Sequence, residues 1–340
     1  MSRWNTTWSS NAHAHWEKGP STSMAAVTKE LPVIAVWRRS SCLLQVFWLR
    51  GLLAAAILLL TACGGAPSRT AQPHEVGPGR TGFWWIVGSS TLRGVEAAGG
   101  TAAARAAFDT PHTFIAGAAG VPSGWTSMSV TSFTSEVALA SALENGSVHT
   151  RAVLLDLEDW PLTPVVEQKD PAGFESEASS LAHAHHLLFI ATPAVDLVRV
   201  LGRNPGETAQ EAYLRLDIAG TAALHADAID IQAQALEQNL PLFTSFVREA
   251  ASQARAAHPG VIVLAGISTN HSGVRASPDQ LLAAVQATRP YVDGYWLNDP
   301  RGGRACPRCT GPYPSVALQF LSELEQQNAA PGTTASSPSA

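Results

Sequence analysis

Lysine is scarce in this chain of 340 residues, and after Cys63 the sequence contains a single one, Lys169. Six of the 22 basic residues and two of the 27 acidic residues precede Cys63, which leaves 16 basic and 25 acidic residues from there onward. A stretch this acidic offers no cationic surface to phosphate backbones. The composition therefore argues against nucleic acid as a partner.

Motifs of cofactor and metal chemistry are also missing. No glycine-rich phosphate loop opens a predicted helix, so nucleotide binding has no support. Lys169 lies outside every predicted strand, which argues against an aldolase-like barrel lyase with an inward lysine. A histidine cluster follows a predicted helix and precedes a predicted strand: His183, His185 and His186. It is therefore expected at the N-terminal ends of the strands, whereas active sites of parallel barrels lie at the C-terminal ends. We therefore expect neither a cofactor nor a bound metal ion.

The apolar run from Gly51 to Leu60 is too short to span a membrane. Three arginines precede it and small residues follow it, which is typical of a signal peptide. Leu60-Thr61-Ala62-Cys63 resembles the lipobox of bacterial lipoproteins, which implies that Cys63 is acylated and begins the mature chain. We expect this lipid to hold the protein at the extracytoplasmic face of the cell membrane. A plain signal peptide or a membrane anchor is the alternative.

Composition divides the chain into four segments. Residues 1–62 are assigned to an N-terminal extension and lipoprotein signal peptide. Residues 63–82 and 328–340 are rich in Gly, Pro, Ser and Thr without periodicity, and we predict a disordered tether and a disordered tail. The remaining segment, 83–327, has the size of one α/β barrel domain.

Within 83–327, short β-branched or aromatic runs alternate with alanine-rich helical runs. This alternation predicts a parallel sheet covered by helices. Helices are expected over 92–107, 135–143, 171–183, 207–224, 242–257, 278–288 and 314–326. Eight strands are expected at 84–88, 113–116, 127–133, 152–157, 187–191, 228–233, 261–267 and 293–297. This number favours an α/β fold with a single (β/α)8 TIM-type barrel over an open doubly wound sheet.

The end of the fourth predicted strand carries two carboxylates. Strand side chains alternate, so Asp156 and Glu158 share the inward side while Leu155 and Leu157 face the helices. In such barrels the C-terminal strand ends form the mouth of the active site. Two close carboxylates disfavour joint ionisation, which keeps one protonated and suits a general acid. The alternative is that these acids cap the following loop or pair with an arginine on the rim.

The sequence Asp156-Leu157-Glu158 resembles the terminal Asp-x-Glu of family 18 chitinase-like glycoside hydrolase barrels. The resemblance implies that Glu158 protonates the glycosidic oxygen and that Asp156 positions the acetamido group of the substrate, which acts as the nucleophile. Arg151 and Leu154 stand where the family has two earlier aspartates, and the sixth strand lacks its tyrosine. The resemblance therefore points to a sugar-active barrel more than to a chitinase.

Other strand ends offer amides and indoles, which suit hydroxyl-rich ligands because they supply hydrogen bonds and stacking without countercharge. The candidates for carbohydrate binding are Trp160 after the fourth strand, Asp230, Gln232 and Gln234 on the sixth, Asn270 after the seventh, and Trp296 and Asn298 on the eighth. A solvated loop rim, or core packing for Trp296, is the alternative interpretation.

Cys306 and Cys309 lie in the loop after the eighth strand. A structural disulfide is expected for them in an exported protein, because zinc would need a second cysteine pair.

Together these features predict an extracytoplasmic glycoside hydrolase-like lipoprotein that cleaves a glycosidic bond of a polysaccharide or glycan with acid assistance. The alternative is a noncatalytic carbohydrate-binding or envelope-associated barrel lipoprotein. The surroundings of Glu158 discriminate between the two. A catalytic Glu158 lies in a pocket near a second acid or a polar partner, whereas a structural one is paired with an arginine.

Overall fold

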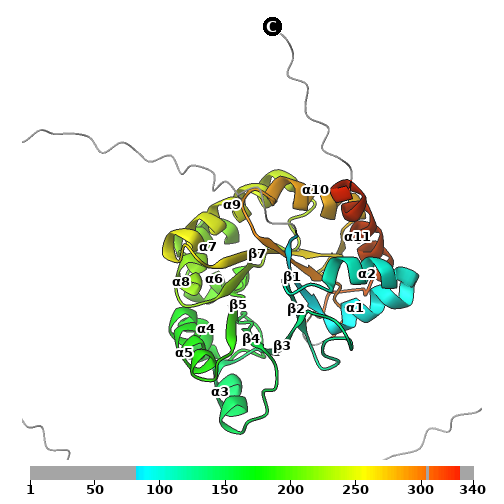
Figure 1. Ribbon diagram of the computed structural model, residues 1–340. Helices are drawn as coiled ribbons and strands as arrows, with labels where there is room; N and C mark the ends of the chain where they lie inside the picture. The colour runs from blue at the N-terminus through cyan, green and yellow to red at the C-terminus, as the bar shows by residue number, and fades with distance from the viewer. Residues whose placement is uncertain (1–81, 304–305, 330–340) are drawn as a thin grey trace, which may run out of the picture. The chain divides into compact units, whose positions relative to one another are not determined.

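A computed structural model describes residues 82–303 and 306–329, which form a closed barrel of eight parallel strands with helices around them (Figure 1). The barrel strands are β1 (Trp84–Gly88), β2 (Thr113–Ala116), β3 (Met128–Phe133), β4 (Ala152–Leu155), β5 (Leu188–Ala191), β6 (Ala228–Ile231), β7 (Ile262–Ser268) and β10 (Gly294–Asn298). The predicted TIM-type barrel is confirmed. The predicted signal peptide, the lipidation site Cys63, nearly all of the tether and all but the first residues of the tail lie outside the described residues.

Helices follow most of the strands. They are α1 (Ser89–Val95), α2 (Thr101–Phe108), α3 (Glu136–Glu144), α4 (Val165–Lys169), α5 (Pro171–Ala184), α6 (Val198–Leu201), α7 (Ala209–Arg215), α8 (Ile218–Ala223), α9 (Leu240–Ala257), α10 (Pro278–Thr288) and α11 (Pro314–Ala329). A small hairpin, β8 (Asn270–His271) and β9 (Val274–Arg275), follows β7. No helix in the described part of the chain is long and apolar enough to span a bilayer.

Two of the expected helices are broken. The helix expected over 92–107 is interrupted at Gly99, where φ is 91°. The helix expected over 207–224 is divided into α7 and α8 by Asp217, where φ is 52°. A left-handed residue cannot continue a right-handed helix, so each chain segment leaves its break in a new direction.

The apolar residues form two layers. Leu154 lies in the barrel interior with Ile86, Phe114 and Leu264. Leu155 belongs to the layer between strands and helices. Each fully buried side chain of this kind contributes roughly 1.5–3 kcal/mol to stability. The alternation along β4 therefore directs the carboxylate two residues after Leu154 into the barrel, as the sequence predicts.

Closure of the barrel depends on a glycine. β10 pairs with both β7 and β1, and Trp84 donates its backbone N–H to Asp293 O at 3.0 Å. A Cβ atom at Gly294 would overlap the backbone carbonyl of Trp84. Only a residue without a side chain lets the two strands approach this closely.

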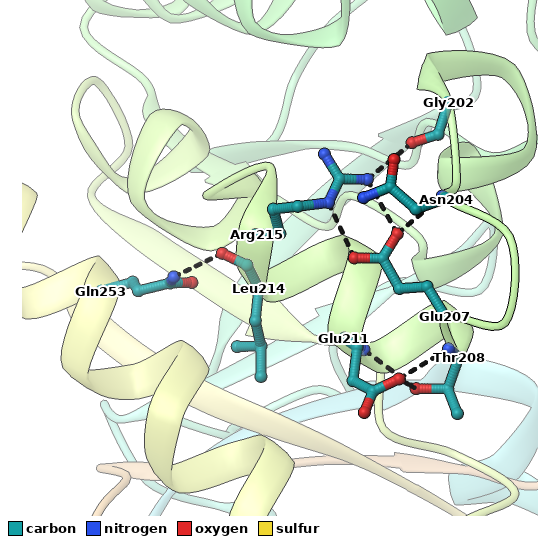
Figure 2. A network of polar contacts seen from close by, with 8 residues as sticks. All are labelled: Gly202, Asn204, Glu207, Thr208, Glu211, Leu214, Arg215 and Gln253. Carbon is teal, nitrogen blue, oxygen red and sulfur yellow. Dashed lines mark hydrogen bonds and ion pairs between the residues drawn. The ribbon is translucent and has the colours of Figure 1, made fainter.

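The long connection between β5 and β6 is held by a polar network (Figure 2). The Arg215 guanidinium donates to Glu207 Oε1 at 2.7 Å, to Glu207 Oε2 at 2.9 Å and to Gly202 O at 2.9 Å. Gln253 on α9 donates to Leu214 O at 2.7 Å, which ties α7 to its neighbour. These contacts fix the course of the connection more than they stabilise the fold, because the ion pair is partly exposed.

Candidate active site

A pocket of about 180 Å³ lies at the C-terminal ends of the strands. It is lined by Asp156, Glu158, Trp160, Gln232, Gln234, Ser268, His271, Trp296, Asn298, Pro300 and Cys306. The structure thus brings together seven of the nine residues that the sequence suggests for catalysis and ligand binding. Asp230 and Asn270 are the two that do not line it.

A larger cavity, of about 420 Å³, lies at the other end of β1, between α2 and α11. Its lining is mostly alanine and large apolar side chains, and it contains one acid, Glu325. Its two titratable side chains, His112 and Glu325, lie at the N-terminal end of the strands, whereas the smaller pocket has a carboxyl pair at the C-terminal ends, so the smaller pocket is the candidate active site.

Asp156 is oriented by residues from the two following strands. Its Oδ1 accepts hydrogen bonds from Thr192 Oγ1 at 2.9 Å and from Gln232 Nε2 at 2.8 Å. Gln232 also donates to Thr192 O at 2.8 Å, which fixes the amide. Burial raises the pKa of Asp156 to about 6, against the opposing effect of the two hydrogen bonds. Asp156 is therefore mostly ionised at neutral pH and held in one orientation.

Glu158, unlike Asp156, is protonated at neutral pH. Burial, followed by the charges of Asp156 and Asp196, raises its pKa to about 9. The raised pKa leaves the Glu158 carboxyl protonated at neutral pH, beside an ionised Asp156. Two carboxyls whose environments separate their pKa values can act as acid and anionic partner.

The arginine nearest to this pair is bound to other acids. Arg199, on α6, contacts Asp159 Oδ2 through Nε and Asp196 Oδ2 through Nη2, both at 2.6 Å. Asp159 also donates its backbone N–H to Asp196 Oδ1 at 3.0 Å. No ion pair in the described part of the chain includes Glu158, whose side chain faces the pocket. Asp196 and Arg199 were not anticipated from the sequence, because no element was expected between the fifth strand and residue 207.

A buried threonine fixes the loop that carries Trp160. Thr163 Oγ1 accepts from Trp160 Nε1 at 2.7 Å and from Glu158 N at 3.3 Å, and it donates to Thr134 O at 2.9 Å. Gln168 donates to Trp160 O at 3.0 Å. The half-buried indole of Trp160 therefore has a fixed position at the pocket, with its N–H already used.

A second glycine makes room inside the pocket. A Cβ atom at Gly266 on β7 would overlap the side-chain amide of Gln234. Trp296 is the register partner of Gly266 on β10. Because position 266 has no side chain, the Gln234 amide lies against the strand near the indole of Trp296, and both line the pocket.

The two remaining candidates are fully buried. Asp230 lies deeper in the barrel than Gln232, two residues earlier on the same face of β6. The amide of Asn270 faces the backbone N–H groups of Thr310 and Gly311, and its oxygen accepts from both in the orientation that satisfies these donors. Asn270 therefore holds the loop after β10 instead of lining the pocket.

Three pocket residues were missed from the sequence, namely Ser268, His271 and Pro300, and a fourth, Cys306, was predicted only as a disulfide partner. Ser268 ends β7 on the inward side and could have been found by its phase. His271 lies on the β8–β9 hairpin, which no local sequence pattern predicts. Burial, followed by the charge of Arg308, lowers the pKa of His271, so its imidazole is neutral at pH 7.

The predicted disulfide between Cys306 and Cys309 is confirmed, and Cys306 forms part of the pocket wall. His183 contacts Asp227 at 2.9 Å, at the N-terminal end of the strands. Across residues 82–303 and 306–329, no group of three or more His, Cys, Asp or Glu side chains is arranged to hold a metal ion.

Compared with protein-family models and with curated protein sequences, the chain gives no match. Solved structures that resemble it include a putative alpha-L-fucosidase from Bacteroides thetaiotaomicron, with 8% identity, a TM-score of 0.36 and coverage of 56% of this chain and 61% of that one. This chain thus spans less than two thirds of that protein.

An active-site mutant of the Rhizomucor miehei beta-1,3-glucanosyltransferase with laminaritriose has 13% identity, a TM-score of 0.28 and coverage of 54% and 84%. An alpha-L-fucosidase from Lactobacillus casei with alpha-L-fucose has 9% identity, a TM-score of 0.23 and coverage of 56% and 78%. These similarities are weak, and the barrel assignment stands on the strand order of this chain itself.

Proposed function

We propose that this protein is a glycoside hydrolase-like enzyme in which Glu158 is the general acid and Asp156 its anionic partner. The observation that carries the proposal is the separation of their pKa values within one pocket, with Glu158 at about 9 and Asp156 at about 6. A protonated acid beside a fixed carboxylate is what acid-assisted cleavage of a glycosidic bond requires.

In the proposed reaction, Glu158 transfers its proton to the glycosidic oxygen as the bond from that oxygen to the anomeric carbon breaks. The resemblance to family 18 barrels suggests the nucleophile, which is the carbonyl oxygen of a 2-acetamido group on the substrate. Asp156 accepts a hydrogen bond from the N–H of that group and stabilises the positive charge that develops on it. Water then attacks the anomeric carbon, the bond from this carbon to the acetamido oxygen breaks, and the acetamido group is restored. Glu158 acts as base in this second step and takes a proton from the water.

The pocket lining supports a carbohydrate ligand. Trp160 and Trp296 present flat apolar surfaces, and Gln232, Gln234 and Asn298 present amides that can bind hydroxyl groups. Because the ligand is recognised without a countercharge, a neutral polysaccharide or glycan is the class of substrate that fits best.

We also propose that Cys63 carries a lipid that holds the barrel at the extracytoplasmic face of the cell membrane. The apolar run and the small residues before Cys63 support this location. The Cys306–Cys309 disulfide agrees with it, because disulfides persist in oxidising compartments.

The test of the proposed activity is a screen of the full chain against envelope polysaccharides and aryl glycosides, with Glu158→Gln beside the natural sequence. Glutamine keeps the shape of the side chain and removes the transferable proton. Hydrolysis of any substrate found should fall by roughly 10² or more, while the melting temperature changes little.

The matched control is Glu144→Gln, an exposed acid at the end of α3, which should leave hydrolysis unchanged. If Glu158→Gln hydrolyses the substrate at the normal rate, Glu158 has a structural role. If the full chain binds glycans without cleaving any of them, the protein is a noncatalytic carbohydrate-binding lipoprotein.

A further inference from the structure

A third carboxyl group lies inside the barrel near the candidate pair. Asp230 is on β6, with Ala228 of the apolar interior before it and Gln232 of the pocket after it on the same face. Its side chain is 0% exposed. Neither of its oxygens has a hydrogen-bond partner among the described residues.

An ionised carboxylate in this position would be very unfavourable, because no described side chain forms an ion pair or a hydrogen bond with it. Asp230 is therefore an uncharged acid, and its O–H is a proton donor in need of an acceptor. A buried O–H donor without a hydrogen-bond acceptor lowers the stability of the fold.

The surroundings of Asp230 indicate the acceptor. The neighbouring positions on β5 and β7 are Thr192 and Leu264, which do not ionise in the physiological range. The titratable group that acts on Asp230 is Asp156, whose charge adds to the effect of burial in raising the Asp230 pKa, and Glu158 follows Asp156 after β4. Tyr213 on α7 packs in the layer between strands and helices, on the other side of β6. Asp156 is the nearest group that is ionised at neutral pH.

The Asp156 carboxylate also has a free side. Its Oδ1 takes the hydrogen bonds of both Thr192 and Gln232, whereas its Oδ2 has no such donor among the described residues. Asp156 and Asp230 both point into the barrel, so the O–H of Asp230 is available as a donor to this second oxygen.

We propose that Asp230 is a positioning residue for Asp156, an uncharged acid deep in the barrel that presents its O–H to the free side of the Asp156 carboxylate. It thereby favours the ionised form of Asp156, and the single negative charge of the three carboxyls lies beside Glu158. Asp156 ionises before Glu158, and Asp230 is still uncharged when Asp156 ionises. The catalytic consequence rests on the proposed function, whereas the order of ionisation does not.

The test is a titration of the Asp156 carboxyl by ¹³C NMR in the full chain labelled with ¹³C-aspartate, assigned by the signal lost in Asp156→Asn. In the natural sequence the midpoint is expected near pH 6. Asp230→Asn keeps the shape and an N–H donor, so the midpoint should stay where it is. Asp230→Leu keeps the volume without a donor, so the midpoint should move to higher pH by about one unit.

Two results would overturn the proposal. A clear fall of the midpoint in Asp230→Asn would mean that Asp230 is ionised in the natural protein, because the substitution then removes a neighbouring negative charge. An unchanged midpoint in Asp230→Leu would mean that Asp156 receives no hydrogen bond from residue 230.

A matched control and a second measurement keep the test decisive. Glu175→Gln replaces another fully buried acid, on α5 and outside the pocket, and should leave the Asp156 titration unchanged. If Asp230→Leu does not fold, urea unfolding of Asp230→Asn decides, because removal of a neutral buried acid should reduce the loss of stability between pH 4 and pH 8. An unreduced loss contradicts the proposal.

Neither readout requires turnover. The expected titration without hydrolysis of any glycoside would refute the proposed function and leave the role of Asp230 standing. Hydrolysis that depends on Glu158, together with an Asp156 titration insensitive to residue 230, would support the proposed function and refute the role of Asp230.

Discussion

Glu175 on α5 is buried on the side of the helix that packs toward the strands, and its Oε1 has no hydrogen-bond partner among the described residues. Burial raises its pKa to about 8. The folded chain therefore keeps a proton that the unfolded chain releases near pH 4.5. Stability due to this group is fully present below pH 4.5 and declines as the pH rises toward 8.

We predict that Glu175→Gln reduces the pH dependence of stability. The natural carboxyl should cost roughly 3 kcal/mol of unfolding free energy between pH 4.5 and pH 7, and an amide of the same shape does not titrate. Urea unfolding at several pH values measures the effect. An equal decline in stability with pH for both proteins would show that Glu175 is not protonated in the folded state.

At the scale of single residues, the alternation of side chains between the two faces of a strand, here called strand phase, predicted much of the site. Asp156 and Glu158 follow the inward alternation of β4, and the same rule found Gln232 and Trp296. Phase gives the direction of a side chain but not its depth in the barrel. For this reason it placed Asp230 with the pocket residues although Asp230 lies below them.

At the scale of elements, the loop after β10 and the β8–β9 hairpin form one packed unit beside the pocket. Asp299 Oδ1 accepts from Thr269 Oγ1 and from Tyr313 N, both at 2.6 Å. The guanidinium of Arg275 lies 4.5 Å from the ring centre of Tyr313. The disulfide fixes the part of this loop that contributes Cys306 to the pocket wall.

We predict that replacing both cysteines by serine loosens this unit while the barrel stays folded. A disulfide that closes so short a loop contributes about 2 kcal/mol. Backbone amide exchange should accelerate in residues 299–313 and in the hairpin, with β1 as the internal reference that does not change. Identical exchange in the two proteins would mean that packing alone holds the loop.

The elements themselves were largely predictable. The observed bounds of β1 and β2 equal the predicted ones, because aromatic and β-branched runs end there at glycine or small residues. The break at Asp217 was not predictable, since aspartate occurs in right-handed and in left-handed conformations and the local sequence does not select between them. The β8–β9 hairpin likewise depends on packing against a loop some forty residues away.

At the scale of the whole molecule, the proposed anchor determines where the barrel acts. We predict that Cys63→Ser abolishes labelling by a fatty-acid analogue and moves the protein out of the membrane fraction, because position 63 then has no thiol to acylate. Cys42→Ser, which replaces the other cysteine before the barrel, is the control and should stay labelled. Unchanged labelling of Cys63→Ser would refute the lipoprotein assignment.

The junction of β1 and β10 has a consequence for biosynthesis. Trp84 and its partner Gly294 are 210 residues apart in the sequence, so during synthesis the first strand appears long before the last. Until β10 is present, one edge of β1 exposes unpaired backbone groups, which other chains could pair with. A nascent chain that stalls before residue 294 therefore remains open and prone to aggregation, whereas completion of β10 removes the hazard at once.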